Sequence, residues 1–140
     1  MSAAAARSRG TSHGPLTGVG PLEAEVLACV WEHEPAAASV REVYEELLEQ
    51  RPIAYTTVMS VLQNLTKKGF LACDRSTASY HYRAARPAQQ VRGEALENVV
   101  GVLYRGRTEV AAAQILGLEG ELSPAQFEEL RRYAGGLLAG

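Results

Sequence analysis

The sequence predicts a mostly α-helical protein that contains one short β-hairpin. Three amphipathic stripes with helical spacing occupy residues 19–69, and the pattern then changes to the alternation typical of two strands, residues 70–75 and 79–84. After the hairpin the helical period returns. Three helices and a two-stranded wing make a winged helix-turn-helix. We therefore expect that fold at residues 19–86 and an α-helical dimerisation domain at residues 87–140.

Length and composition suit one domain, or one domain with a small appendage. The 140 residues are 46% hydrophobic and 21% charged, and no stretch approaches the roughly 20 apolar residues of a membrane span. Residues 1–18 are small, polar and glycine-rich, so we expect a flexible arm and no secretory signal. Cys29 and Cys73 lack CxxC spacing. This favours reduced cysteines in a cytoplasmic protein that does not insert into membranes.

The first two helices carry clear start signals. Pro21 suits a first helical position, and Glu23 suits the positive end of the helix dipole. Ser39 is a natural N-cap for the second helix, and Glu42 completes a capping box three residues later. Their buried stripes are expected to be Leu22, Val26, Leu27, Val30 and Trp31 in the first helix and Val40, Val43, Tyr44, Leu47 and Leu48 in the second.

The third helix lies in the stretch AYTTVMSVLQNLTKKGFL, residues 54–71. We expect Thr56 as its N-cap and Gly69 as its C-cap residue. Its apolar residues recur at helical spacing and should point inward: Val58, Val61, Leu62 and Leu65. The helix ends on Lys67 and Lys68, the only lysines in the chain. One buried face, one face of small polar residues and a basic end are typical of a recognition helix in the DNA major groove.

The C-terminal segment should hold three helices whose apolar faces need a cover. The first ends near Arg105, a short second one ends at Gly117, and Ser123 caps the last, with Gln126 closing a capping box. Because these helices follow a complete small domain, a second copy of the chain is the expected cover. The alternative is that they fold back on their own winged helix. The expected dimerisation residues are Val91, Val99, Leu103, Phe127, Leu130 and Leu137.

A charge gradient runs through the winged-helix segment. Residues 21–50 hold eight glutamates and one arginine, whereas residues 51–86 hold six basic residues and one acidic residue, a local net charge of +5. The chain as a whole has a formal net charge of −2, but binding to a polyanion needs only a local patch. A winged helix used for protein–protein interaction is the alternative. It has no reason to concentrate lysine at the end of its third helix.

The predicted fold assigns roles in DNA binding. Thr57 and Ser60 lie near the start of the third helix, where side chains reach base edges, and their hydroxyls can hydrogen-bond to bases or phosphates. Basic residues would contact the phosphate backbone and supply affinity without sequence information. A neutral, solvent-exposed face is the alternative interpretation of the hydroxyl residues. The expected DNA-binding residues are Thr56, Thr57, Ser60, Asn64, Lys67, Lys68, Arg41, Arg75 and Arg83.

No pattern in the sequence indicates catalysis, a cofactor or a metal. We find no Ser/His/Asp arrangement, glycine-rich phosphate loop or pair of inward-facing carboxylates. His13, His33 and His81 fall in the arm, at a helix end and on a strand, without the spacing of metal ligands. We therefore expect no enzyme activity, no cofactor and no metal site.

Three segments carry a recognisable pattern: GPLEAEVLACVWE, SVREVYEELLEQRPIAYTTVMSVLQNLTKKGFL and YHYRA. They resemble the penicillinase and methicillin-resistance repressor family, the BlaI/MecI type, and the similarity runs from about Val19 to Leu138. The resemblance implies a homodimeric winged-helix repressor. Such a protein would bind a pseudo-palindromic operator in duplex DNA through its third helix and dimerise through its C-terminal helices.

The same resemblance implies control by an inducing signal that weakens the dimer. In that family a membrane sensor with a metalloprotease domain commands cleavage of an Asn-Phe bond, so a membrane sensor protease is an implied partner. Gln114 and Ile115 stand at the equivalent place here, so the cleavage pair is altered. Copper-responsive relatives carry a C-terminal cysteine cluster, whereas this chain has no cysteine after Cys73. A ligand- or partner-responsive winged-helix regulator is the alternative.

Overall fold

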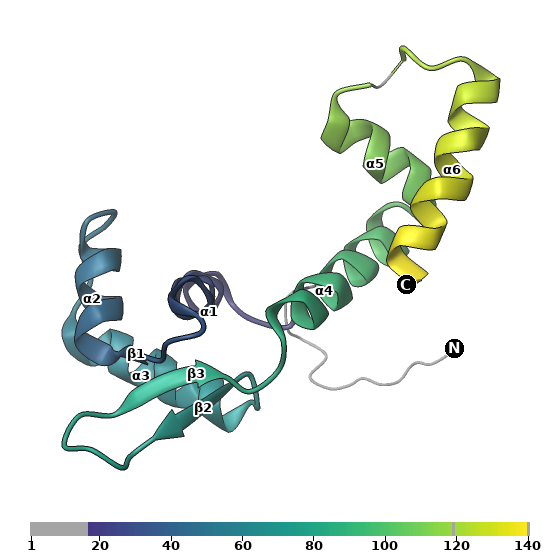
Figure 1. Ribbon diagram of the computed structural model, residues 1–140. Helices are drawn as coiled ribbons and strands as arrows, with labels where there is room; N and C mark the ends of the chain where they lie inside the picture. The colour runs from purple at the N-terminus through teal and green to yellow at the C-terminus, as the bar shows by residue number, and fades with distance from the viewer. Residues whose placement is uncertain (1–16, 119, 140) are drawn as a thin grey trace. The chain divides into compact units, whose positions relative to one another are not determined.

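The computed structural model describes residues 17–118 and 120–139, with side chains as far as Ala134. The elements, in chain order, are α1 (Pro21–His33), β1 (Ala38–Ser39), α2 (Val40–Leu48), α3 (Tyr55–Lys67), β2 (Leu71–Asp74), β3 (His81–Ala84), α4 (Ala88–Leu103), α5 (Thr108–Leu116) and α6 (Pro124–Ala139) (Figure 1). The predicted fold class, a mostly helical chain with a winged helix followed by further helices, is confirmed. All but the last two positions of the predicted arm, residues 1–18, lie outside the described residues.

Local hydrogen bonds set the starts of α1 and α2 where the sequence predicts them. The backbone N–H of Gly20 donates to Glu23 Oε1 at 2.9 Å, so Pro21 becomes the first residue of α1. The N–H of Glu42 donates to Ser39 Oγ at 3.1 Å, and the N–H of Ser39 donates to Glu42 Oε1 at 2.8 Å. This reciprocal pair satisfies two backbone donors that a helix start otherwise leaves unpaired.

The start of α3 differs from the prediction. Its N-cap is Ala54, and the N–H of Val58 already donates to the Ala54 carbonyl at 3.2 Å. The prediction of Thr56 as N-cap is therefore wrong, and Thr56 is the second residue of the helix. The ring of Tyr55 packs edge-to-face on Tyr44, with 5.4 Å between the ring centroids. This contact holds the first residue of α3 against α2.

The wing contains one strand more than predicted. Strands β2 and β3 form the predicted antiparallel hairpin, with Leu71 opposite Ala84. The two residues of β1 pair with the other edge of β3, so the strand order is β1-β3-β2. Two residues are too few to show an alternating pattern, which explains why the sequence does not reveal β1. Tyr82 in the middle strand is only 2% exposed and fixes the sheet to the core.

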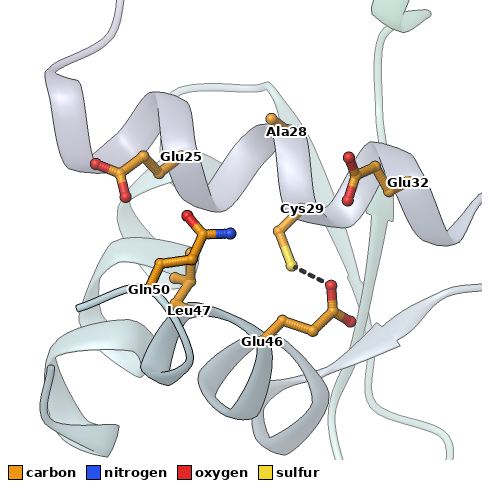
Figure 2. Close-up of a pocket in the computed structure, with 7 residues that line it drawn as sticks. All are labelled: Glu25, Ala28, Cys29, Glu32, Glu46, Leu47 and Gln50. Atoms are coloured by element: carbon orange, nitrogen blue, oxygen red, sulfur yellow. Dashed lines mark hydrogen bonds between the residues drawn. The ribbon is translucent and has the colours of Figure 1, made fainter. Parts of the chain in front are cut away.

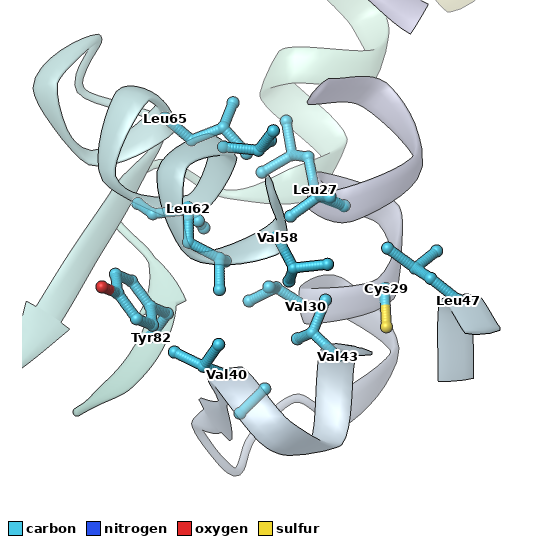
Figure 3. Close-up of a cluster of buried hydrophobic side chains, with 14 of the residues drawn as sticks. Leu27, Cys29, Val30, Val40, Val43, Leu47, Val58, Leu62, Leu65 and Tyr82 are labelled. Atoms are coloured by element: carbon cyan, nitrogen blue, oxygen red, sulfur yellow. The ribbon is translucent and has the colours of Figure 1, made fainter. Parts of the chain in front are cut away.

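Helices α1, α2 and α3 and strand β3 enclose one hydrophobic core (Figure 3). The predicted inward residues of α3 are all buried, and those of α1 and α2 are mostly so. Leu48 is an exception, since it is 44% exposed and the buried stripe of α2 stops at Leu47. The core side chains with no exposed surface are Val26, Val30, Ala38, Val43, Val58, Leu62 and Leu65.

The chain folds into two compact units, the first ending at Val91 and the second starting at Arg92. Val91, in the first turn of α4, is 7% exposed and belongs to the core of the first unit. The sequence places the end of the winged helix at residue 86 and assigns Val91 to a dimer face. In the structure, the chain's own winged helix covers this side chain.

The second unit is built on contact between α5 and α6. Gly117, with a φ of +73°, ends α5 in the left-handed conformation that glycine adopts easily. Ser123 and Gln126 exchange hydrogen bonds of 2.9 and 3.2 Å at the start of α6, as predicted. No described helix is long and apolar enough to cross a membrane. Among the described side chains from α4 onward, the exposed large apolar residues are Leu96, Val102, Leu103, Ile115, Leu116 and Tyr133.

Candidate nucleic-acid interface

The outer face of α3 is a polar, solvent-exposed surface. Because the core buries the opposite face of this helix, side chains at the alternate helical positions must point to solvent. Thr57, Ser60, Asn64 and Lys67 are three or four residues apart and therefore lie along one line of the helix. The exposed residues of this outer face are Thr56, Thr57, Ser60, Gln63, Asn64 and Lys67.

Gln63 belongs to this surface but was not among the predicted DNA-binding residues. It is exposed, and it lies three residues after Ser60 and four before Lys67. A glutamine amide can make a paired hydrogen bond to the N6 and N7 atoms of adenine in the major groove. Its spacing from two residues already assigned to the outer face is the signal that could have identified it.

The start of α3 is electrostatically open. Its first turn contains no acidic residue, and its N-cap residue, Ala54, makes no side-chain hydrogen bond to the backbone N–H groups. The positive end of the helix dipole is therefore available to an anion such as a phosphate. Arg41 lies beside this end, with its guanidinium 6.0 Å from the centre of the Tyr55 ring. The Arg41 side chain also contacts Glu45 at 3.7 Å but stays 70% exposed.

The two lysines at the end of α3 have different surroundings. Lys68 Nζ donates to Glu23 Oε1 at 2.8 Å, across 45 positions of sequence. Partial burial of Glu23 opposes its ionisation, but hydrogen bonds from Lys68 and Gly20 hold its pKa below the ordinary value. Lys67 is exposed and has no ion pair in the part of the chain that the structure describes. Lys67 is therefore the lysine that is free to meet a phosphate.

The wing offers two arginines and one opposing charge. Arg75 lies over the Tyr80 ring, 5.2 Å from its centre, and Arg83 is exposed on β3. The backbone N–H of Ser76 donates to Asp74 Oδ1 at 2.9 Å, and this hydrogen bond lowers the pKa of Asp74. The ionised carboxylate weakens the positive potential of the wing. Residues 76–79 at the tip of the hairpin include no basic residue, so the wing should add only a weak backbone contact.

The residues assigned to dimerisation and cleavage lie mostly in the second unit. Leu103 is 67% exposed at the end of α4. Gln114 and Ile115 lie inside α5. Gln114 Oε1 accepts a hydrogen bond from the Tyr104 hydroxyl, and Ile115 is 75% exposed. Leu137 lies outside the described side chains. The remaining predicted residues, all partly buried, are Val99, Phe127 and Leu130.

Three packed helices with a wing, and a third helix whose outer face is polar, define a winged-helix protein of the helix-turn-helix class. The chain belongs to the penicillinase repressor family, which it matches over residues 19–135. This is a family of transcriptional regulators and not of enzymes.

Relatives with curated names agree with this assignment. The chain is 43% identical over 68 residues to the "Transcriptional regulator BlaI" of two Mycobacterium tuberculosis strains, a match that covers 48% of this chain and 48% of each relative. It therefore spans about half the length of these relatives. It is 24% identical over 113 residues to the "Methicillin resistance regulatory protein MecI" of Mammaliicoccus sciuri, which covers 81% of this chain and 89% of that relative.

The contrast between the two lysines can be tested by salt titration. We expect Lys67→Ala to weaken binding to every duplex, and to reduce the slope of log K against log salt by about one unit for one lost phosphate contact. Lys68→Ala should leave that slope nearly unchanged, because Glu23 already neutralises the ammonium group. Fluorescence anisotropy with one labelled duplex at four or five salt concentrations measures both slopes. Equal changes in the two variants would show that the ion pair with Glu23 does not hold in the complex.

Proposed function

We propose that this chain acts as a dimeric repressor that binds a pseudo-palindromic operator in duplex DNA through α3. One observation carries the proposal: α3 exposes a line of polar side chains that ends in a lysine with no ion pair among the described residues, while the apolar side chains of its other face are buried. Membership of the penicillinase repressor family supports this function. Binding to an operator would place the protein in the cytoplasm.

Within this proposal, residues near the start of α3 read the sequence and the basic residues set the position. Thr57 and Ser60 are short, so the helix backbone can approach the base edges closely. Gln63 and Asn64 reach further and can donate and accept at once. The phosphate contacts come from the exposed bases around α3 and on the wing, and from the open N-terminal end of the helix. These basic residues are Arg41, Lys67, Arg75 and Arg83.

Dimerisation through the helices beyond the winged helix explains the apolar residues exposed there. Leu103 is 67% exposed and Ile115 is 75% exposed, and removing such large aliphatic side chains from water against a partner is favourable. A second copy of the chain would cover them. Two linked recognition helices then meet two half-sites about one DNA turn, or a multiple of it, apart.

Release follows from the same arrangement, because any signal that separates the protomers removes the gain from two linked sites. The Gln114–Ile115 bond lies inside α5. A protease, such as one that a membrane sensor commands, would need α5 to open locally before it could reach this bond. The altered residue pair and the helical setting both favour a signal other than cleavage at this bond.

Base reading by α3 is tested by removing two hydroxyls. We expect Thr57→Ala and Ser60→Ala each to weaken binding to the operator by about 1–3 kcal/mol, the usual value of one good base contact. Binding to a scrambled duplex of equal length should stay nearly constant, because both residues are uncharged. Titrations with both duplexes at one salt concentration give the ratio. A parallel loss on operator and scrambled DNA would contradict base reading by these residues.

The dimer is tested by placing a charge on the exposed apolar surface. We expect Leu103→Glu to be monomeric at concentrations where the wild type is dimeric, because the carboxylate would have to be buried at the interface. Affinity for a complete inverted repeat should fall by roughly 100- to 10,000-fold, while affinity for a single half-site stays the same. Sedimentation velocity and DNA titration measure the two effects.

A matched control is available in the first unit. Leu48→Glu makes the same substitution at a residue that is 44% exposed in α2, outside the proposed interface. It should remain dimeric and bind the inverted repeat as the wild type does. If Leu103→Glu stays dimeric, or if Leu48→Glu dissociates equally, the proposed interface is refuted.

A further inference from the structure

Three side chains of metal-ligand type meet between α1 and α2. Cys29 and His33 lie one turn apart on α1, and Glu46 faces them from α2. Cys29 Sγ donates to Glu46 Oε1 at 3.2 Å, and His33 Nε2 lies 2.5 Å from Glu46 Oε2. One ligand atom from each residue lies within 4.8 Å of the others. Figure 2 shows Cys29 and Glu46 pointing toward one another across the space between the two helices.

The donor set fits one class of cation. Sulfur, imidazole nitrogen and carboxylate oxygen are together the ligands of zinc, whereas magnesium and calcium take oxygen ligands. Zinc holds sulfur at about 2.3 Å and nitrogen or oxygen at about 2.0–2.2 Å, so ligand atoms of a tetrahedral site lie roughly 3.3–3.7 Å apart. The sulfur–oxygen separation of 3.2 Å is already close to this value. The other Glu46 oxygen, Oε2, lies 2.5 Å from His33 Nε2, so this pair would have to move apart by about 1 Å to hold a zinc ion between them.

Helical spacing supports the same interpretation. Two ligands at positions i and i+4 point to the same side of a helix, which is the arrangement that zinc-binding helices use. Cys29 and His33 have this spacing, which the sequence-based expectation of no metal site overlooked. A third ligand from a neighbouring helix closes one face of the tetrahedron and leaves the fourth position for water or a further carboxylate.

The surroundings favour a cation and give it access. A pocket beside the cluster is lined by Glu25, Ala28, Cys29, Glu32, Glu46, Leu47 and Gln50 (Figure 2). The carboxylates that line this pocket attract a cation electrostatically, and a bound metal ion would replace the thiol proton of Cys29. Glu25 is engaged by Arg51 at 2.7 Å, so it is not counted as a ligand.

We propose that Cys29, His33 and Glu46 form a binding site for a divalent transition-metal cation of the zinc class, which joins α1 to α2. Both helices pack on α3, so the cation would hold together the two elements that support the recognition helix. Binding would stabilise the folded state, because an unfolded chain does not hold the three ligands together. This site lies on helices of the first unit and does not depend on the proposed DNA contacts.

Cobalt(II) is the probe of choice, because a cobalt–thiolate bond gives a charge-transfer absorption that oxygen and nitrogen ligands do not. Titration of the reduced full-length protein with Co²⁺ should produce this absorption with one ion per chain, and Zn²⁺ should abolish it by competition. Cys29→Ser should remove the absorption. Cys73→Ser, which deletes the other thiol of the chain, should retain it. An absorption that is missing from the wild type, survives in Cys29→Ser or is lost in Cys73→Ser would overturn the proposal.

Because Cys29 is buried, Cys29→Ser could lose metal binding through a folding defect, so variants of the two partly exposed ligands are also tested. His33→Gln and Glu46→Gln should each weaken Co²⁺ binding by at least about tenfold. The control is Glu49→Gln, which changes an exposed glutamate three residues beyond Glu46 at the end of α2. This variant should bind Co²⁺ as the wild type does. Zn²⁺ should raise the melting temperature of the wild type and of Glu49→Gln by roughly 5–15 °C at 100 times the dissociation constant. An equal rise in Glu46→Gln would show that the metal binds elsewhere.

Discussion

The structure depends on how α3 is packed. Val58, Leu62 and Leu65 have no exposed surface, and the helices that cover them, α1 and α2, surround one side of α3. Burying three such side chains contributes roughly 1.5–3 kcal/mol each, upper values that assume an extended unfolded chain. This packing fixes the rotation of α3 about its own axis. The polar residues at the other helical positions must then face solvent, which creates the surface proposed to meet DNA.

Signals that act within a few residues could be predicted from the sequence. The capping box of Ser39 and Glu42 and the inward face of α3 need only local spacing, and the structure confirms both. Features that depend on distant residues could not be predicted. The strand β1 exists because two residues meet the edge of β3, and Tyr55 starts α3 early while its ring contacts Tyr44 from another helix.

The same distinction between local and distant interactions applies to the candidate nucleic-acid interface. The outer face of α3 follows from helical period alone, and the same period could have added Gln63. The ion pair between Lys68 and Glu23 joins residues 45 positions apart. The different surroundings of Lys67 and Lys68 therefore could not be predicted from their adjacent positions in the sequence. The cluster of Cys29, His33 and Glu46 between α1 and α2 could be predicted from the sequence only in part. The spacing of Cys29 and His33 is visible in the sequence, but the third ligand comes from α2 and becomes evident only in the fold.

The central claim is that a pair of α3 helices, each held by its own core, reads two equal half-sites. Selection of binding sites for the full-length protein from random duplex DNA tests this most directly. The account predicts an enriched inverted repeat whose half-site centres lie about 10–10.5 base pairs, or a multiple of that, apart. Enrichment of a single unrepeated motif, or no enrichment above random sequence, would contradict it.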